Sequence, residues 1–401
     1  MIYRDCSNII TILLLLIGLY FPTSLNQNIS TNLMFFQYII IIVIYITLLK
    51  KNKKMNFKKF LISILINVIL LFCTIRNSMF SNLEEISFGA YIPILAISIM
   101  YLLDLKKIKC NYKIDKILLI VNIINTVLNL MIISGNENIM EFIKNFYSAS
   151  YDNLLLYMFN QNKPVLTFGT HSIAGFYTFI LLYLNYLMYK YKHKNLNFLF
   201  SLMYLFSLFS LKSTTSYIFF MIGIGIYLKD LNKKRGALIV STLVVITIAF
   251  LINSNEINNL IYNININFTG FKSRFEDSAI FSNNIAYIYN NFFNPIGLGY
   301  RQDLYYSDNG YIINLMRGGV VYLILIYYGL YRFIIDNIID KKIGYFLFFI
   351  FAVFEVGYPI IFYRRTVYLL PFIIILINYT ITDKSKHKKG VEDESMRINS
   401  R

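Results

Sequence analysis

Charged residues are scarce in this chain of 401 residues. Only 15% of its positions are Asp, Glu, Lys or Arg, whereas soluble proteins average about 25%, and 57% are hydrophobic. This balance excludes an ordinary soluble globular protein and indicates an integral membrane protein. Acidic residues are the scarcer kind, 21 against 38 basic ones, which gives a formal charge of +17. In a soluble protein that charge would suggest nucleic-acid binding. In a membrane protein the basic residues instead mark which connections between helices are cytoplasmic.

Cysteine and phosphate-binding motifs are also rare or missing. Cys6, Cys73 and Cys110 have neither the spacing of a disulfide pair nor that of a metal site, so we expect them to be packing residues. The sequence has no glycine-rich phosphate loop, no HExxH or CxxC motif and no nucleotide fingerprint. We therefore expect no metal, no cofactor and no reaction driven by a nucleotide.

Long apolar runs are abundant along the whole chain. Each is near the length that crosses roughly 30 Å of hydrocarbon as a helix, and the runs are continuous rather than alternating. They predict an all-α polytopic membrane protein of about 12 transmembrane helices that form a single domain over residues 1–401. Pro359 and Pro371 are the expected helix kinks. The expected spans are 8–22, 34–49, 60–75, 86–103, 117–134, 172–190, 196–211, 215–229, 237–252, 310–333, 343–362 and 366–381.

Basic residues concentrate in alternate connections between these runs. The positive-inside rule then predicts that both termini are cytoplasmic, including the basic tail at 382–401. The first run has no small-residue cleavage site after it, which favours a retained anchor over a signal peptide. Ten basic residues fall on the outer side: Arg76, Lys144, Lys163, Lys212, Lys272, Arg274, Arg301, Arg317, Arg364 and Arg365.

Two outer connections are long, 135–171 and 253–309. Long connections are usually functional or disordered, and the second is rich in Tyr and Phe, which favours an ordered segment. Residues 279–292 have apolar positions near helical spacing and predict a short helix on the membrane face. The sequence NPIGLGY, with Pro295 and two glycines, is expected to end that helix in a turn.

Three of the outer arginines occur close together in the sequence. Arg274, Arg301 and Arg317 lie in the second long connection and the helix after it, on the side that the positive-inside rule depletes of such residues. A guanidinium offers a planar set of donors suited to phosphate, so the arginines suggest an anionic ligand with its tail in lipid. The alternative is that they reach phospholipid headgroups or pair with Glu276, Asp277 and Asp303.

Two residues are candidates for a general base. Asp308 stands where the second long connection re-enters the membrane and is placed to act as a base. It is equally placed to cap the following helix, although Asn309 also suits that role. His171 is the histidine on the outer side, either a base or orienting donor or a polar packing residue.

The tight outer turn at Lys212 to Ser216 combines one cation with several hydroxyl groups, as KSTTS. Such a turn suits phosphate oxygens or sugar hydroxyls, and Thr214 and Ser216 are its candidate sugar contacts.

Taken in order, these features resemble the bacterial O-antigen polymerase and O-antigen ligase superfamily, in particular its Wzy-type oligosaccharide repeat-unit polymerases. The segments that carry the resemblance are FGTHSIAGFY, LKSTTSYIFF, SRFEDSAIFSNNIAYIYNNFFNPIGLGY and DNGYIINLMRGGVVYLIL. Ligases usually carry His where this chain has Asp308, which favours a polymerase. The arginine of the family's serine turn is absent, and Lys212 is its nearest substitute.

The resemblance implies a glycosyltransferase that polymerises polyprenyl-diphosphate-linked oligosaccharide repeat units on the outer face of a bacterial cytoplasmic membrane. An O-antigen ligase and a flippase or other transporter of lipid-linked oligosaccharide are the alternatives. The implied partners are the lipid-linked oligosaccharide, membrane lipids, a flippase and a chain-length regulator, with no nucleic acid. The implied roles are diphosphate binding by Arg274, Arg301, Arg317 and Lys212, base catalysis by Asp308 or His171, and sugar binding by Thr214, Ser216, Asn309 and Glu276.

Overall fold

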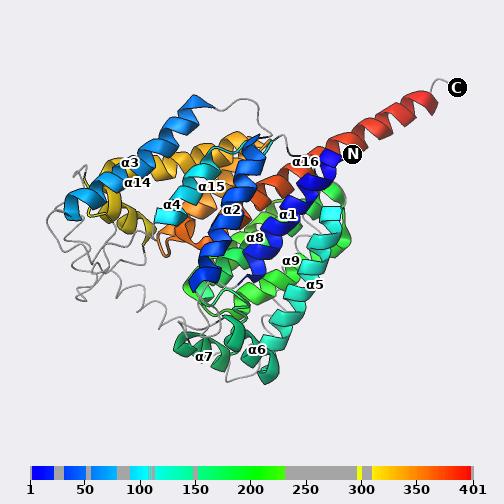
Figure 1. Ribbon diagram of the computed structural model, residues 1–401. Coiled ribbons are helices and arrows are strands. Elements are labelled where there is room, and N and C mark those ends of the chain that lie inside the picture. The colour runs from blue at the N-terminus through cyan, green and yellow to red at the C-terminus, as the bar shows by residue number, and fades with distance from the viewer. Residues whose placement is uncertain are drawn as a thin grey trace. The chain divides into compact units, whose positions relative to one another are not determined.

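Every regular element in the described part of the protein is a helix (Figure 1). The computed structural model describes residues 2–21, 31–50, 56–78, 91–106, 108, 110, 113–147, 152–230, 296–299 and 309–398. The helices are α1 Ile2–Tyr20, α2 Thr31–Lys50, α3 Phe57–Ser78, α4 Tyr91–Tyr101, α5 Lys113–Ile133, α6 Glu137–Tyr147, α7 Asp152–Asn160, α8 His171–Lys192, α9 Asn195–Ser210, α10 Thr214–Asp230, α14 Gly310–Asn337, α15 Lys341–Glu355 and α16 Arg364–Ile398, with a 3₁₀ turn η3 at Ile360–Phe362.

Most of the predicted spans coincide with helices of the structure. Each expected range except 237–252 overlaps a helix, although α15 ends earlier than predicted and α16 continues further, and 237–252 lies outside the described residues. Within the described residues, five helices are long and apolar enough to cross a membrane: α3, α5, α8, α14 and the first part of α16. The first long connection contains α6 and α7. Pro359 lies between α15 and η3, whereas α16 continues through Pro371.

Apolar side chains on the outside of the helices indicate a membrane protein. On α2, Phe36, Ile39, Val43 and Ile46 are 44% to 56% exposed, and their spacing places them on one face of the helix. A soluble monomer rarely exposes contiguous apolar surface of this kind. Contact with lipid tails explains the face without any further partner.

The described residues form two compact units. The flanking unit contains the residues up to Leu119 and those from Ile296 onward, and the central unit contains those from Ile120 to Asp230. In the flanking unit α1 packs on α16, α3 packs on α14, and α14 packs on α15. The central unit is built around α8, which packs against both α9 and α10 and is buried over most of its length.

Buried asparagines join three helices of the central unit. Asn122 and Asn185 exchange hydrogen bonds, with Asn122 Nδ2 donating to Asn185 Oδ1 at 2.8 Å and Asn185 Nδ2 donating to Asn122 Oδ1 at 3.1 Å. Asn197 Nδ2 also donates to Asn185 Oδ1 at 2.8 Å, and Tyr204 Oη donates to Asn122 Oδ1 at 2.9 Å. Because these polar groups satisfy one another, α5, α8 and α9 are held in one register.

Candidate functional site

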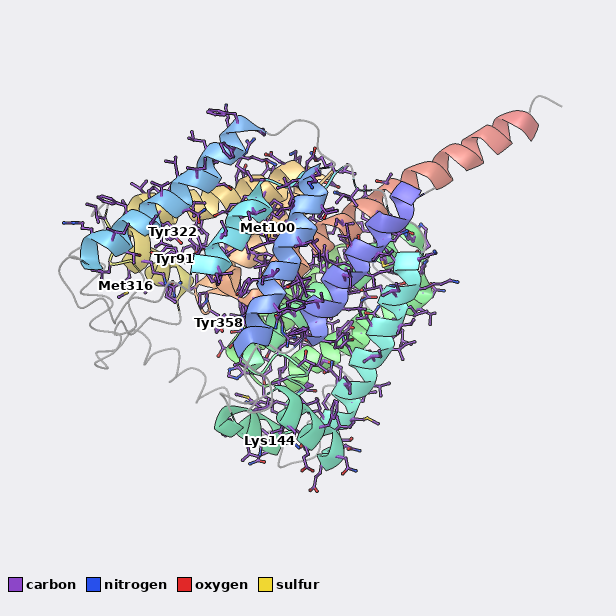
Figure 2. All side chains as sticks on the ribbon, viewed as in Figure 1. Tyr91, Met100, Lys144, Met316, Tyr322 and Tyr358 are labelled. Carbon is purple, nitrogen blue, oxygen red and sulfur yellow. The ribbon has the colours of Figure 1, made fainter. Side chains whose placement is uncertain are left out.

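Helix α14 is broken in its first half. Gly319 has φ 75° and ψ −176°, a combination that is accessible almost only to glycine. The break divides α14 into an arm, residues 310–318, and a stem, residues 320–337 (Figure 1). In Figure 2, Met316 of the arm and Tyr322 of the stem are labelled on either side of the break.

The arm folds back against the stem. Asn314 Nδ2 of the arm donates to Tyr327 Oη of the stem at 3.2 Å. The ring centroids of Tyr311 and Tyr327 lie 4.6 Å apart. Residues 314 and 327 would be about 20 Å apart along a straight helix at a rise of 1.5 Å per residue. Side chains of Asn and Tyr cannot span that distance, so the arm and the stem form a sharp V with Gly319 at its vertex.

The segment from Ile296 to Gly299 binds the backbone that the break exposes. Leu298 N donates to Met316 O at 2.7 Å, and Gly299 N donates to Arg317 O at 2.7 Å. In an unbroken helix these carbonyls would accept from N–H groups four residues further on, which the turn at Gly319 carries away. The segment thereby satisfies two polar groups that cannot remain unpaired in a nonpolar environment.

Two glycines allow this close approach. A Cβ on Gly297 would overlap the backbone carbonyl of Arg317. Gly299 has φ +71°, and a Cβ there would overlap Thr74 near the end of α3. The glycines of NPIGLGY are therefore required by packing, and the segment fits against the vertex of the V.

A buried carboxylate fixes the arm, the stem and the end of α15 together. Glu355 is fully buried, its Oε2 accepts from Tyr327 Oη at 2.9 Å, and its Oε1 accepts from Ile361 N at 2.7 Å. A Cβ on Gly310 would overlap this carboxylate, so the arm begins directly against it. Within the described residues Glu355 forms no ion pair with a Lys or Arg, and hydrogen bonds alone hold it in place.

Arg317 lies on the arm two residues before the break. Its side chain is partly buried, and its guanidinium lies over the ring of Phe362 of η3, 5.6 Å from the ring centroid. Two further arginines follow η3 directly. Arg364 lies over the ring of Tyr38, and the buried Arg365 donates from Nη1 to Leu19 O. Arg317, Arg364 and Arg365 therefore lie at the end of the flanking unit that contains the break, as does Arg76 in the last turn of α3.

The central unit holds the other described candidates where α8 and α10 begin. His171 is the first residue of α8, which is capped by Thr170 Oγ1 accepting from Ile173 N at 3.4 Å. Ser213 and Ser216 form a reciprocal cap at the start of α10: Ser213 Oγ accepts from Ser216 N at 3.2 Å, and Ser216 Oγ accepts from Ser213 N at 3.1 Å. The buried hydroxyl of Ser216 therefore stabilises the cap, whereas Thr214 is exposed.

The structure places the predicted site residues in different parts of the chain. Arg317 and Asn309 belong to the flanking unit, where Asn309 Oδ1 caps α14 by accepting from Tyr311 N and Ile312 N. His171, Lys212, Thr214 and Ser216 belong to the central unit. The remaining predicted site residues, Arg274, Glu276, Arg301 and Asp308, lie outside the described residues.

Sequence reasoning missed Gly319, Tyr327 and Glu355 as parts of a site. The signal available for the break was the pair Gly318–Gly319 beside an arginine inside an apolar run. Glu355 is an acidic residue within the predicted span 343–362, but its partner Tyr327 is recognisable only once α14 folds on itself.

Neither metal ligation nor similarity to other proteins identifies the site. Among the described residues, no group of three or more His, Cys, Asp or Glu side chains is arranged to hold a metal ion. No protein-family model matches the chain, and neither a curated protein nor a solved structure matches it. The broken helix and the charged groups around it are therefore what indicates its chemistry.

Proposed function

We propose that the protein is a membrane glycosyltransferase that joins polyprenyl-diphosphate-linked oligosaccharide repeat units into a surface polysaccharide, such as capsule, O-antigen or exopolysaccharide. In this proposal the chain crosses the bacterial cytoplasmic membrane about 12 times, has both termini in the cytoplasm and works at the outer face. The proposal combines the family resemblance of the sequence with the chemistry available around Arg317.

The observation that carries the proposal is Arg317 on an arm that ends at a helix break. Non-helical backbone at membrane depth is tolerated where protein covers it or where it lines a cavity, and broken helices of membrane proteins frequently form binding sites. An arginine inside such a segment costs several kcal/mol unless it has a role or a partner. The planar guanidinium suits a diphosphate bound at the membrane edge, with the lipid tail extending into the bilayer.

The positions of the basic residues in the flanking unit support an orientation in which the vertex of the V faces the outside. Arg332 Nη2 and Lys59 Nζ lie 3.1 Å and 3.8 Å from Asp336 Oδ2, near the end of the stem and the start of α3. Cys73, near the other end of α3, lies beside Gly318 at the vertex. Lys59 and Arg332 are thus at the opposite end of the flanking unit from Arg317, as the positive-inside rule requires if the vertex is external.

The proposed reaction needs charge neutralisation and one base. The leaving diphosphate is already a stable anion, so the reaction requires no general acid, in contrast to glycosidases with their paired carboxylates. Arg317, together with Arg274 and Arg301, would neutralise the charge that develops on the diphosphate. Asp308 is the proposed base. Asn309 caps α14, which is the other role that the sequence allowed for Asp308.

The test is complementation of a strain that lacks its own polymerase, with the surface glycan resolved by length. Arg317→Ala should reduce polymerisation about 10²–10³-fold, as losing one preorganised donor does elsewhere, and should leave mainly single repeats. Arg332→Ala is the matched control because it removes an arginine from the same helix at the opposite end. A wild-type ladder from Arg317→Ala at normal protein level would overturn the proposed site.

The same strains separate the proposed polymerase from its two alternatives. Lipid-linked single repeats should accumulate on the outer face when a polymerase is lost, and on the inner face when a flippase is lost. Loss of a ligase would leave polymerised glycan that is not attached to its final acceptor. Only the first result is compatible with the proposal.

A further inference from the structure

Lys163 is a buried lysine in the connection between α7 and α8. The residue is only 6% exposed, and its amine lies over the ring of Tyr157, 5.7 Å from the ring centroid. Its backbone is fixed on both sides: Lys163 N donates to Met158 O at 3.0 Å, and Val165 N donates to Lys163 O at 2.8 Å. The backbone of Lys163 is therefore fixed by the fold, and its amine is enclosed beside Tyr157.

Among the described residues, Lys212 is the charged neighbour that acts on the Lys163 amine. Burial, and secondly the nearby Lys212, lower the pKa of the Lys163 amine from its usual value to about 8. Within the described residues Lys163 forms no ion pair with a carboxylate and no side-chain hydrogen bond. Burying the Lys163 cation is unfavourable and the nearby Lys212 adds to the cost, so an anion bound to the Lys163 amine would stabilise it.

The surrounding backbone adds to the positive potential. Lys212 directly precedes Ser213, which caps α10. Gly175 in the second turn of α8 packs against Ser216 in the first turn of α10, so closely that a Cβ added to Gly175 would lie 3.4 Å from Ser216 Cβ. The N-terminal parts of α8 and α10 therefore lie side by side, and Lys212 stands directly before the N-terminal end of α10, which carries a partial positive charge.

The connections that carry the two lysines have fixed, uncommon backbone conformations. Asn162, Leu166 and Lys212 have φ values of 52°, 50° and 49°. These values lie in the left-handed region, which residues other than glycine seldom adopt. Residues held there cost of order 1–3 kcal/mol each and persist where the surrounding structure enforces them. Lys163 and Lys212 are thus presented on a rigid frame.

We propose that Lys163 and Lys212 form an anion site in the central unit that takes a phosphate or diphosphate group. An anion between the two amines would remove their repulsion and satisfy the buried charge of Lys163. The polymerase reaction joins two lipid-diphosphate substrates, so the site would hold the diphosphate of one of them. That assignment rests on the proposed function, whereas the anion site itself does not.

The proposal fixes the direction of a pH dependence. An anion favours the protonated amine, so binding raises the pKa of Lys163 above its value in the free protein. Affinity is then highest below pH 8, where the free protein already holds the proton, and falls as the pH rises through about 8. Among the described residues, the titratable group in contact with the amine is Tyr157, Lys212 is close enough to lower its pKa, and His171 begins α8 eight residues further along the chain.

The test is calorimetric titration of the purified full-length protein with inorganic pyrophosphate, in nanodiscs made only of zwitterionic lipid. Lys163→Met should weaken binding at least tenfold. Lys163→Arg should retain binding and lose the decline above pH 8, because arginine keeps its charge. The matched control is Lys190→Met, since Lys190 also lies over a tyrosine ring, that of Tyr186 at 5.5 Å, but at the far end of α8.

Further arms identify the source of the phosphate and the origin of the pH effect. Nanodiscs that contain phosphatidylglycerol should weaken pyrophosphate binding if the site prefers lipid headgroups, and a short-chain polyprenyl diphosphate should bind more tightly than pyrophosphate if it prefers substrate. The decline above pH 8 should survive His171→Gln. Loss of the decline in that variant, or equal pyrophosphate binding by wild type and Lys163→Met, overturns the inference.

The glycan ladder distinguishes this inference from the proposed function. If Lys163→Met loses pyrophosphate binding and gives a shorter glycan ladder, both the anion site and its assignment to the polymerase substrate are supported. If binding is lost while the ladder remains normal, the anion site stands and its assignment to the polymerase substrate fails.

Discussion

Asn314 and Tyr327 are 13 positions apart in the same helix, yet Asn314 Nδ2 donates to Tyr327 Oη at 3.2 Å. The contact shows that α14 is an arm folded on a stem and not one continuous rod. The stem, residues 320–337, is about 27 Å long at 1.5 Å per residue and suffices by itself to cross most of a bilayer. The arm is then free to present Arg317 at one end of the flanking unit without serving as part of a span.

The first prediction concerns the vertex of the V. Gly319→Ala should destabilise the protein by about 1–3 kcal/mol, because alanine cannot adopt φ 75° with ψ −176° without strain. Thermal unfolding of the purified protein in detergent measures the loss. Gly225→Ala is the control: Gly225 is inside α10, and a Cβ there meets no atom within 4 Å. The control should be neutral or slightly stabilising, and equal destabilisation by both substitutions would contradict a special role for Gly319.

The helices were largely predictable from the sequence, whereas the break was not. Apolar runs locate helices because each one must bury its backbone polar groups within itself. The bend of α14 depends on a single glycine conformation and on partners from distant segments. These are Leu298 and Gly299 for the exposed carbonyls and Glu355 for Tyr327. The sequence therefore predicts kinks at Pro359 and Pro371, where proline lacks an N–H, and does not predict the break at Gly319.

The candidate site was also predictable only in part, because its contacts join residues that are distant in the sequence. Arg317 is conspicuous in the sequence because a charge in an apolar run needs an explanation. Lys163 is not conspicuous, because its burial depends on how the α7–α8 connection winds through Asn162 and Leu166. Ser216 was predicted as a sugar contact from its hydroxyl alone. Its engagement with Ser213 appears only in three dimensions, and the sugar contact remains a prediction.

A second prediction tests whether Tyr327 holds the arm closed. Tyr327→Phe removes the hydroxyl that donates to Glu355 and accepts from Asn314, which should weaken closure by about 1.5–3 kcal/mol. Cys73 is a built-in reporter, since its buried Sγ contacts Gly318 O beside the vertex. In a Cys6→Ser, Cys110→Ser background, alkylation of Cys73 should become about ten- to hundredfold faster, because 1.4 kcal/mol corresponds to a factor of ten.

The control for the Cys73 experiment is Tyr328→Phe. Tyr328 is the next residue of the stem and is 48% exposed, so losing its hydroxyl should leave the alkylation rate unchanged. If Tyr327→Phe also leaves the rate unchanged, the hydrogen bond to Glu355 does not control the position of the arm.

A third prediction concerns the central unit. Asn185→Leu should destabilise the protein by about 1–3 kcal/mol, because the buried amide groups of Asn122 and Asn197 lose the oxygen to which both donate. Asn195→Ala changes an exposed asparagine at the start of α9 and should stay within about 0.5 kcal/mol of wild type. Chemical unfolding in detergent, followed by tyrosine fluorescence, compares the two. Equal stability of both variants would show that the asparagine network contributes nothing net.

The last prediction separates stability from sugar binding at the start of α10. Ser213→Ala removes the Oγ that accepts from Ser216 N and should lower stability by about 1 kcal/mol. Thr214→Ala removes an exposed hydroxyl one residue further on and should leave the thermal midpoint unchanged. If Thr214 contacts substrate as proposed, its variant should nevertheless give shorter glycan ladders at equal protein level. A normal ladder from Thr214→Ala, with the expected drop in midpoint for Ser213→Ala, would show that Thr214 does not contact the substrate.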